Sequence, residues 1–301
     1  MAGSGSSTTS SRTSTSWSTS DAPAARLAAV VRLVHPFPSV LDGLVVAAVA
    51  GFAGGGIEAA LRLGASMTLL QFAIGTLNDI VDAPMDAGRD PPKAIPAGLV
   101  TPDAARVVTA LTAGLGLLLA FASGAAVFLV AIVVLGVGVA YDIAAKGTPW
   151  SWLPFAIGIP LLPVYGWLGV ASYVPVGLAV LLPMAFLAGA GLAIANARAD
   201  LEADLRSGTR SVATALGSDR SWWVGAALMA GATGVGLALS RPGGWSTWTI
   251  ALVVVGTGVV AVGLLLGRSR AAGPRRRAWE VQAVGAAIAA VGWTPVLLPG
   301  G

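Results

Sequence analysis

Residues 78–98 read N-D-I-V-D-A-P-M-D-A-G-R-D-P-P-K-A-I-P-A-G and follow directly on an apolar run at residues 67–77. This segment holds four of the chain's 14 acidic residues. Carboxylates at the end of an apolar helix cost free energy in a membrane and mark functional sites. The segment therefore predicts a site at the end of a membrane helix, within a larger membrane domain. The four carboxylates belong to Asp79, Asp82, Asp86 and Asp90.

The composition is that of a membrane protein. The 301 residues are 55% hydrophobic and only 11% charged, with a mean hydropathy of +0.80, whereas soluble domains carry about 25% charged residues. The absence of cysteine excludes thiolate chemistry, and the single histidine, His35, excludes a zinc site built on histidines. We predict an all-α polytopic membrane protein with no nucleic-acid partner.

Nine apolar segments follow residue 26, each close to the roughly 20 residues that cross a bilayer. The first two are separated by Gly54, Gly55 and Gly56, which we expect to form a turn. Residues 1–25 are rich in Ser and Thr and predict a disordered tail, which leaves 26–298 as one transmembrane domain. The predicted spans are 38–55, 57–77, 104–122, 125–141, 152–170, 174–195, 222–239, 248–266 and 279–297.

The basic residues indicate the orientation. With nine spans, all Lys and Arg residues except Arg62 and Arg241 fall on the side that carries the N-terminus. The positive-inside rule makes that side cytoplasmic, so we predict a multi-pass protein of the cell (inner) membrane with a cytoplasmic N-terminus. Nearly all acidic residues share this side, where we therefore expect the chemistry.

A second acidic motif follows the sixth predicted span. Asn196, Asp200 and Asp204 are spaced by four residues, and residues four apart lie on one face of a helix. Each motif would thus present a stripe of carboxylates to a shared cavity. The simpler alternative is a pair of solvated helix ends that are neutralised by nearby arginines. The matching stripe of the first motif is Asn78, Asp82 and Asp86, with Asp79 three residues before Asp82.

Two facing carboxylate stripes need a cation between them. Carboxylate oxygens suit Mg²⁺, which proteins usually hold with a few carboxylates and substrate phosphates. Basic side chains could contact the oxygens of a diphosphate, and together with the metal they would stabilise a leaving pyrophosphate. The basic candidates are Lys93, Lys146 and Arg210, with Arg206 as a weaker one.

At these residues the sequence resembles the UbiA-type intramembrane prenyltransferase superfamily. The family's N-D-x-x-D-x-x-x-D motif is matched at residues 78–86, and its second D/N-x-x-x-D-x-x-x-D motif at 196–204. The family's (R/K)-P-I-P-x-G segment is matched at 93–98, with Ala94 in place of the usual Pro. Gly208, Thr209 and Arg210 resemble a following G-x-(R/K), and Tyr141, Asp142 and Lys146 resemble the family's connection between helices four and five.

The resemblance implies nine helices around a central cavity, with two Mg²⁺ ions holding an isoprenyl diphosphate at the cytoplasmic mouth. Loss of pyrophosphate would give an allylic cation that an acceptor captures. We expect Mg²⁺-dependent transfer of an isoprenyl group to a lipophilic acceptor, aromatic or a quinone precursor, among membrane lipids. The expected catalytic residues are Asp79, Asp82, Asp200 and Asp42, the diphosphate-binding residues Asn78, Lys93, Lys146, Asn196 and Arg210, and the metal ligands Asp82, Asp86, Asp200 and Asp204.

Two residues in the first span region have competing interpretations. Asp42 lies about one turn inside the span, where a charge is costly. It could face the cavity and orient or deprotonate the acceptor, or it could pair near the interface with Arg32 or another basic residue. His35 precedes Pro36 at the membrane entry, and we expect an interfacial residue there rather than a catalytic base.

Other functions remain open on these residues. A terpene cyclase of the same superfamily would ionise the same diphosphate but close the cation on itself. A transporter is a non-enzymatic alternative, although the acids crowd one membrane face rather than the midplane. The continuous acidic block of CDP-alcohol phosphotransferases is absent. The arginines at 275–277 predict a contact with anionic lipids or a topology signal.

Overall fold

The structure is a computed structural model that describes residues 22–87, 93–171, 173–240 and 242–298. Most of the predicted disordered tail lies outside these residues, as do Gly88, Arg89 and Asp90 of the first acidic segment. The last four residues assigned to the tail, 22–25, belong to a helix.

The described part of the chain is helical throughout and contains no strand. Two short irregular turns interrupt it, a π turn (Tyr141–Ala145) and a 3₁₀ turn (Pro242–Gly244). The helices are α1 (Ala22–Leu33), α2 (Pro36–Phe52), α3 (Ile57–Asp82), α4 (Pro102–Ala122), α5 (Ala125–Ala140), α6 (Leu153–Leu168), α7 (Leu178–Ala199), α8 (Leu201–Ser207), α9 (Val212–Leu216), α10 (Ser218–Leu239), α11 (Thr247–Leu266) and α12 (Ala272–Leu297).

Each predicted span corresponds to a helix, and the chain is a multi-pass membrane protein. Seven helices in the described residues are long and apolar enough to cross a bilayer. The helix α2 has 17 residues and reaches that length only together with α1, from which it is bent by 54°. The helix α6 is a shorter apolar helix of 16 residues. The predicted turn at Gly54–Gly56 is present, since α2 ends at Phe52 and α3 begins at Ile57.

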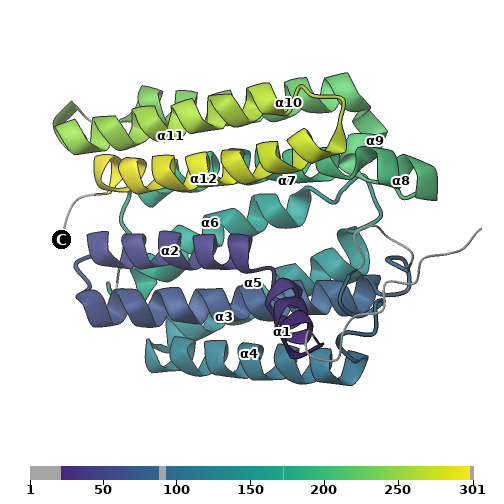
Figure 1. Ribbon diagram of the computed structural model, residues 1–301. Coiled ribbons are helices and arrows are strands. Elements are labelled where there is room, and N and C mark those ends of the chain that lie inside the picture. Colours follow the sequence, from purple (N-terminus) through teal and green to yellow (C-terminus); the bar gives the residue numbers. More distant parts are fainter. Residues whose placement is uncertain (1–21, 88–92, 172, 241, 299–301) are drawn as a thin grey trace, which may run out of the picture.

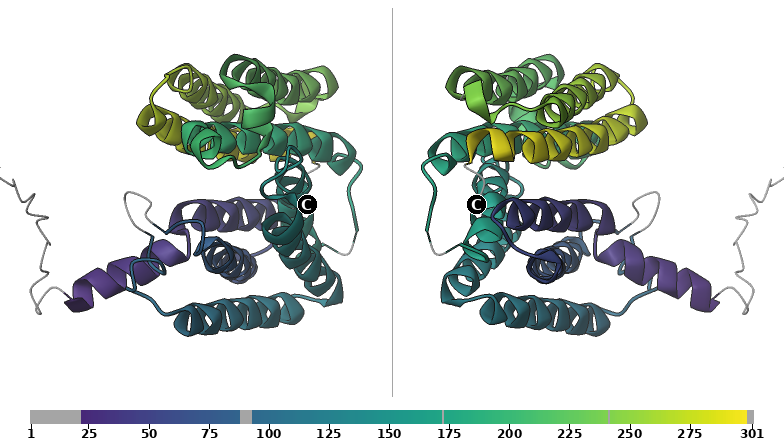
Figure 2. Two further views of the ribbon diagram at one scale, coloured as in Figure 1. Left: turned by 90° about the vertical axis from the view of Figure 1, so that its right-hand side faces the viewer. Right: turned by 90° about the vertical axis from the view of Figure 1, so that its left-hand side faces the viewer.

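The helices form two groups (Figures 1 and 2). Helices α2 to α5 lie on one side and α7 with α10 to α12 on the other, while α6 runs between them. Contacts of α2 with α12 and of α6 with α7 close the bundle. Apart from α1, the long helices run in roughly one direction. Their ends therefore make two opposite faces of the bundle.

Small residues bring the helices close together, as expected for membrane helices. A Cβ atom at Gly43 of α2 would lie 2.7 Å from the carbonyl oxygen of Gly64 on α3. A Cβ atom at Gly256 of α11 would lie 2.4 Å from the backbone nitrogen of Ala289 on α12. Larger residues at either position would force these backbones apart.

Candidate active site

The first acidic motif lies at the end of α3. Asn78, Asp79 and Asp82 occupy its last two turns, and the N–H of Asp86 donates to the carbonyl of Asp82 at 2.9 Å, which adds one further turn. The three carboxylates of Asp79, Asp82 and Asp86 are only 5–7% exposed. Buried carboxylates are costly unless cations or hydrogen-bond donors compensate them.

Two lysines supply part of this compensation. The Nζ of Lys93 lies 2.7 Å from Asp79 Oδ1, 2.9 Å from Asp86 Oδ2 and 3.8 Å from Asp82 Oδ2, and Lys146 donates to Asp82. Burial works to lower the pKa of Lys93, but its hydrogen bonds and charge interactions with Asp79 and Asp86 outweigh burial and raise that pKa above its usual value. Lys93 is therefore held as a cation among the acids.

His35 and Asp142 also contact this motif, and neither was among the predicted site residues. The Nε2 of His35 lies 3.1 Å from Asp79 Oδ1. His35 precedes α2 in the left-handed region (φ 50°) and packs on Gly75, where a Cβ atom would lie 3.1 Å from the histidine side chain. Asn78 donates from Nδ2 to Asp142 Oδ1 at 2.7 Å. The sequence predicts His35 at the membrane interface, but it does not predict the contact of His35 with Asp79.

Two carboxylates of this site have an oxygen that could bind a metal ion. Within the described residues, Asp82 Oδ1 and Asp142 Oδ2 are buried without a hydrogen-bond partner. Hard carboxylate oxygens of this kind suit a divalent cation such as Mg²⁺. In the part of the chain that the structure describes, no three His, Asp or Glu side chains are arranged so that they could hold a metal ion. The donor set fits Mg²⁺, and the lysines would have to move from the carboxylates as it binds.

The second acidic motif is arranged differently from the prediction. Asn196 lies in the last turn of α7, Asp200 is the junction between α7 and α8 with φ −102° and ψ 5°, and Asp204 lies on α8. The three residues therefore do not form a stripe on one continuous helix. The N–H of Asp204 still donates to the carbonyl of Asp200 at 2.9 Å, which keeps the two carboxylates one turn apart. All three side chains are half-buried.

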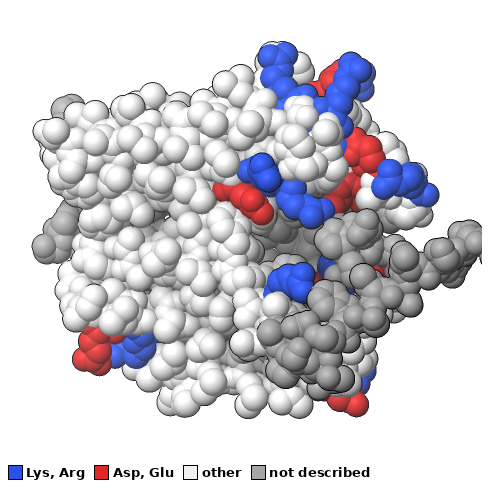
Figure 3. All heavy atoms as spheres, viewed as in Figure 1, with Lys and Arg blue, Asp and Glu red and all other residues white. Residues whose placement is uncertain are grey.

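The two motifs share the same end of the molecule. Tyr141 lies within electrostatic reach of Asp82 in the first motif and of Asp200 and Asp204 in the second. Figure 3 shows most charged residues of this face at the end where α8 and the start of α12 lie, while the remaining surface is almost uncharged. Arg210, also predicted for this site, is exposed before α9.

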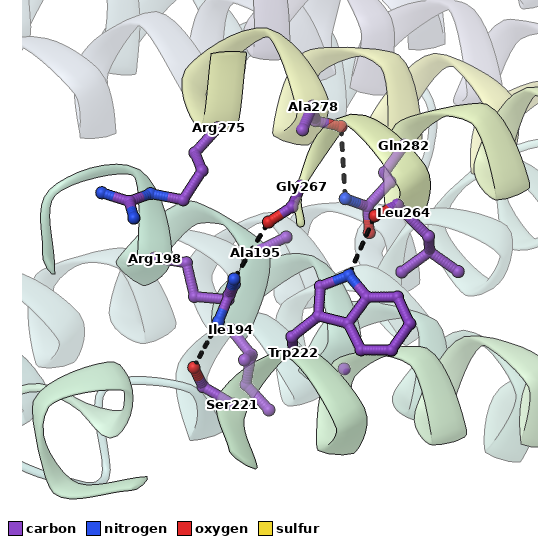
Figure 4. A pocket seen from close by; sticks show the side chains of 11 residues that line it. Ile194, Ala195, Arg198, Ser221, Trp222, Leu264, Gly267, Arg275, Ala278 and Gln282 are labelled. Atoms are coloured by element: carbon purple, nitrogen blue, oxygen red, sulfur yellow. Dashed lines mark hydrogen bonds between the residues drawn. The ribbon is translucent and has the colours of Figure 1, made fainter. Parts of the chain in front are cut away.

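Two arginines, Arg198 and Arg275, line a small pocket between α7, α10, α11 and α12 (Figure 4). Arg198 of α7 donates to Ser221 Oγ at 2.7 Å and to the carbonyl of Gly267 at 2.9 Å. Arg275 is 2% exposed and pairs with Glu202 of α8. The expectation that the 275–277 run contacts lipid is therefore wrong for Arg275, whose side chain points into the protein. Burial favours a higher pKa for Glu202, but Arg275 outweighs it and lowers that pKa.

Asp42 faces an apolar cavity of about 180 Å³ that extends between the helices. The cavity is lined by α2, α6, α7, α10, α11 and α12. Asp42 makes no hydrogen bond or ion pair with any described residue, and Arg32 instead donates to the carbonyl of Ala28. The alternative that Asp42 pairs with Arg32 is thus wrong.

Fold and site together define a helical, multi-pass membrane protein with an acidic site at one end of its bundle and an apolar cavity within it. The sequence matches the UbiA prenyltransferase family over residues 39–294. The chain belongs to this family, which confirms the resemblance seen in its two acidic motifs. A search of the curated proteins found no match.

Solved structures share the fold. The apo structure of a UbiA homolog from Aeropyrum pernix K1 has a TM-score of 0.68 at 18% identity, over 85% of this chain and 96% of that one. A UbiA homolog from Archaeoglobus fulgidus bound to DMAPP and Mg²⁺ has 0.66 at 19%, over 86% and 98%. A digeranylgeranylglyceryl phosphate synthase has 0.64 at 15%, over 91% and 99%. At these identities the likeness establishes the fold.

Proposed function

We propose that this protein is a Mg²⁺-dependent prenyltransferase that moves an isoprenyl group from a prenyl diphosphate to a lipophilic, aromatic or quinone-precursor acceptor. The observation that carries the proposal is the set of buried carboxylates at the end of α3. They include one oxygen, Asp82 Oδ1, that has no hydrogen-bond partner among the described residues, and they lie beside Lys93 and Lys146. The Archaeoglobus fulgidus homolog with DMAPP and Mg²⁺ supports this choice of ligands.

The diphosphate would bind between the two acidic motifs. Asp82, Asp86, Asp200 and Asp204 would hold Mg²⁺, which when bound neutralises the diphosphate and the pyrophosphate that leaves. Lys93 and Lys146 would then turn from the carboxylates to the phosphate oxygens, as charge-assisted donors. The remaining diphosphate-binding residues would be Asn78, Asn196 and Arg210.

Transfer would proceed by ionisation of the donor. The bond between the prenyl C1 and the diphosphate oxygen breaks, and its electron pair leaves with pyrophosphate. Asp79, Asp82 and Asp200 would act where this charge separates. The allylic cation would be captured by the acceptor, which forms the new bond and loses a proton. The apolar cavity would exclude water, and its carboxylate, Asp42, would orient the acceptor.

The charge distribution supports a cytoplasmic active site. The charged end of the bundle contains both motifs, whereas Glu58 and Arg62 form a local pair at the opposite end of α3, 3.0 Å apart. By the positive-inside rule, the N-terminus and both motifs would face the cytoplasm, with the bundle in the cell (inner) membrane. Residues 26–298 would form this single domain.

The test uses the purified full chain with prenyl diphosphates of five to twenty carbons and a panel of phenols and quinols. Products are identified by mass and pyrophosphate is measured. Asp82→Asn and Asp200→Asn should each abolish Mg²⁺-dependent pyrophosphate release, whereas Asp103→Asn, an exposed residue of α4 that pairs with Arg106, should not. Binding of the diphosphate that survives both changes would refute the site. A cyclic hydrocarbon formed without any acceptor would refute the transferase.

A further inference from the structure

The helices α7, α10, α11 and α12 meet at a small pocket that the proposed reaction does not use (Figure 4). Arg198 of α7 donates to Ser221 Oγ of α10 at 2.7 Å and to the carbonyl of Gly267, just after α11, at 2.9 Å. Trp222 of α10 donates from Nε1 to the carbonyl of Leu264 on α11 at 2.9 Å. These hydrogen bonds join three of the four helices around the pocket.

The first turns of α12 form the fourth wall. A Cβ atom at Gly263 of α11 would lie 2.6 Å from Cγ of Gln282, and one at Gly267 would lie 3.6 Å from Cβ of Ala278. Ala278 and Gln282 follow Arg275 by about one and two turns, so the three side chains share one face of α12. All three line the pocket. Arg275 therefore reaches the pocket from a helix face that α11 holds in place.

The pocket has more positive than negative charge. Arg198 and Arg275 are only 5% and 2% exposed, and their two charges repel each other. Among the described residues, two carboxylates favour the charge of Arg198. One is Glu202, which already pairs with Arg275. The other is Asp219, which is exposed, so that solvent screens it. One buried positive charge is therefore left without a close counter-ion, which is costly.

The side chain of Arg275 keeps one donor for an occupant of the pocket. Within the described residues its Nε is buried without a hydrogen-bond partner, although its Nη atoms donate to Glu202 and to the carbonyl of Arg270. Leaving a donor of a charged group unsatisfied costs more than leaving a neutral one. The amide of Gln282 has two N–H groups and donates one of them to the carbonyl of Ala278, at 3.2 Å. The pocket thus offers donors to an occupant that accepts.

The size of the pocket limits that occupant to a single small particle. Its volume is about 20 Å³, and roughly 10–15 Å³ is enough for one water molecule. A phosphate group or a lipid headgroup is too large. A water molecule fits, but it brings no charge. A monatomic anion fits, accepts hydrogen bonds from several donors at once and neutralises the unpaired positive charge.

We propose that this pocket binds a halide ion between Arg198 and Arg275, with chloride as the halide that a cell supplies. The ion accepts hydrogen bonds from Nε of Arg275, from the guanidinium group of Arg198 and from the second N–H of Gln282. It holds the start of α12 against the end of α7, two residues before Asp200. This site is separate from the proposed prenyl transfer and requires neither Mg²⁺ nor a diphosphate.

The first experiment measures thermal unfolding of the purified full chain without Mg²⁺, followed by the loss of helical circular dichroism. Sodium chloride replaces sodium gluconate stepwise at constant ionic strength, because gluconate is too large for the pocket. Chloride should raise the unfolding temperature along a saturating, single-site curve, since an ion that binds only the folded state stabilises it. Bromide should act in the same way.

Three variants test the donors of the pocket. Gln282→Leu and Arg275→Lys each remove one donor, and Arg275→Lys keeps a cation for Glu202. Each should weaken chloride binding, read from the unfolding curves, by about tenfold, as expected for a lost hydrogen bond to an ion. Arg198→Met removes the unpaired charge and should abolish the chloride effect. If Arg198→Met fails to fold, the two milder variants decide.

Arg277→Gln is the matched control. It removes an exposed arginine of the same run, outside the pocket, and should keep the chloride response of the unmodified protein. A second measurement locates the ion. Crystals grown in bromide should show an anomalous peak between Arg198 and Arg275.

Three results would overturn the proposal. An unfolding temperature that does not depend on halide would leave water as the occupant, and a bromide peak without such stabilisation would be an adventitious ion only. An equal chloride response in Gln282→Leu, Arg275→Lys and the unmodified protein would place the stabilising chloride elsewhere. A bromide peak found only outside the pocket would do the same.

Discussion

Glu202 of α8 and Arg275 of α12 form an ion pair that joins the second acidic motif to the last helix. Arg275 is almost fully buried and also donates to the carbonyl of Arg270 at 3.2 Å. One residue further on, Arg276 lies 3.8 Å from Asp200. The two arginines thus tie α8, which carries Asp204, and its first neighbour Asp200 to the start of α12.

Arg275→Met should loosen this motif. Removing the buried partner of an ion pair costs about 3 kcal/mol, here somewhat less because Glu202 remains partly exposed. We expect faster thermal inactivation of the purified protein and weaker Mg²⁺ binding. The charge-exchanged double variant Glu202→Arg with Arg275→Glu should recover part of both losses. Full Mg²⁺ affinity in Arg275→Met would show that α8 is positioned without this pair.

The Glu202–Arg275 pair should make the stability of the metal-free protein fall in acid. Arg275 lowers the pKa of Glu202 below its usual 4.5. A lowered folded-state pKa contributes stability above the unfolded value, and this contribution is lost as the pH falls through the folded-state pKa. Unfolding between pH 6 and pH 3, followed by tryptophan fluorescence, should therefore show a smaller loss of stability in Glu202→Gln than in the unmodified protein. Equal pH profiles would contradict the prediction.

Lys93 should contribute most to the stability of the fold when Mg²⁺ is absent. Lys93→Gln leaves Asp79 and Asp86 without their shared cation, so the metal-free protein should lose about 2 kcal/mol. Mg²⁺ should raise the unfolding temperature of this variant more than that of the unmodified protein, because binding to the folded state stabilises it and no lysine competes for the carboxylates. Arg106→Gln, which removes an exposed pair with Asp103, serves as the control. An identical Mg²⁺ response would argue against a metal at this motif.

Most of the fold followed from the sequence because each apolar segment has to cross the same bilayer. The turn at Gly54–Gly56 and the helix-end position of Asp82 were predictable for the same reason. The bend between α1 and α2 was not, since it depends on the positive φ of His35 before Pro36. Spacing alone also implied one helix through Asp200, whereas the chain breaks there between α7 and α8.

The residues of the candidate site that lie within one short motif could be predicted from the sequence. The residues that join the site through packing of distant helices could not. Asn78, Asp82 and Asp86 were found by their spacing. The contact between His35 and Asp79 joins residues 44 positions apart, and Asp142 reaches Asn78 from another helix. Three consecutive arginines at 275–277 gave no indication of which one turns inward. These contacts come from tertiary structure, which no local pattern specifies.

Gly75→Ala should reduce activity through His35. A Cβ atom at position 75 would lie 3.1–3.2 Å from the histidine side chain, so the ring must shift, and its 3.1 Å contact with Asp79 should lengthen. If the contact orients Asp79 for ionisation of the donor, kcat for pyrophosphate release should fall about tenfold in both Gly75→Ala and His35→Ala, as for a lost positioning interaction. The double variant should be no slower than either single variant, because both remove the same contact. Gly114→Ala, at a glycine of α4 with open space around it, should keep full activity. Additive losses in the double variant would show that Gly75 and His35 act independently, and that the histidine does not work through Asp79.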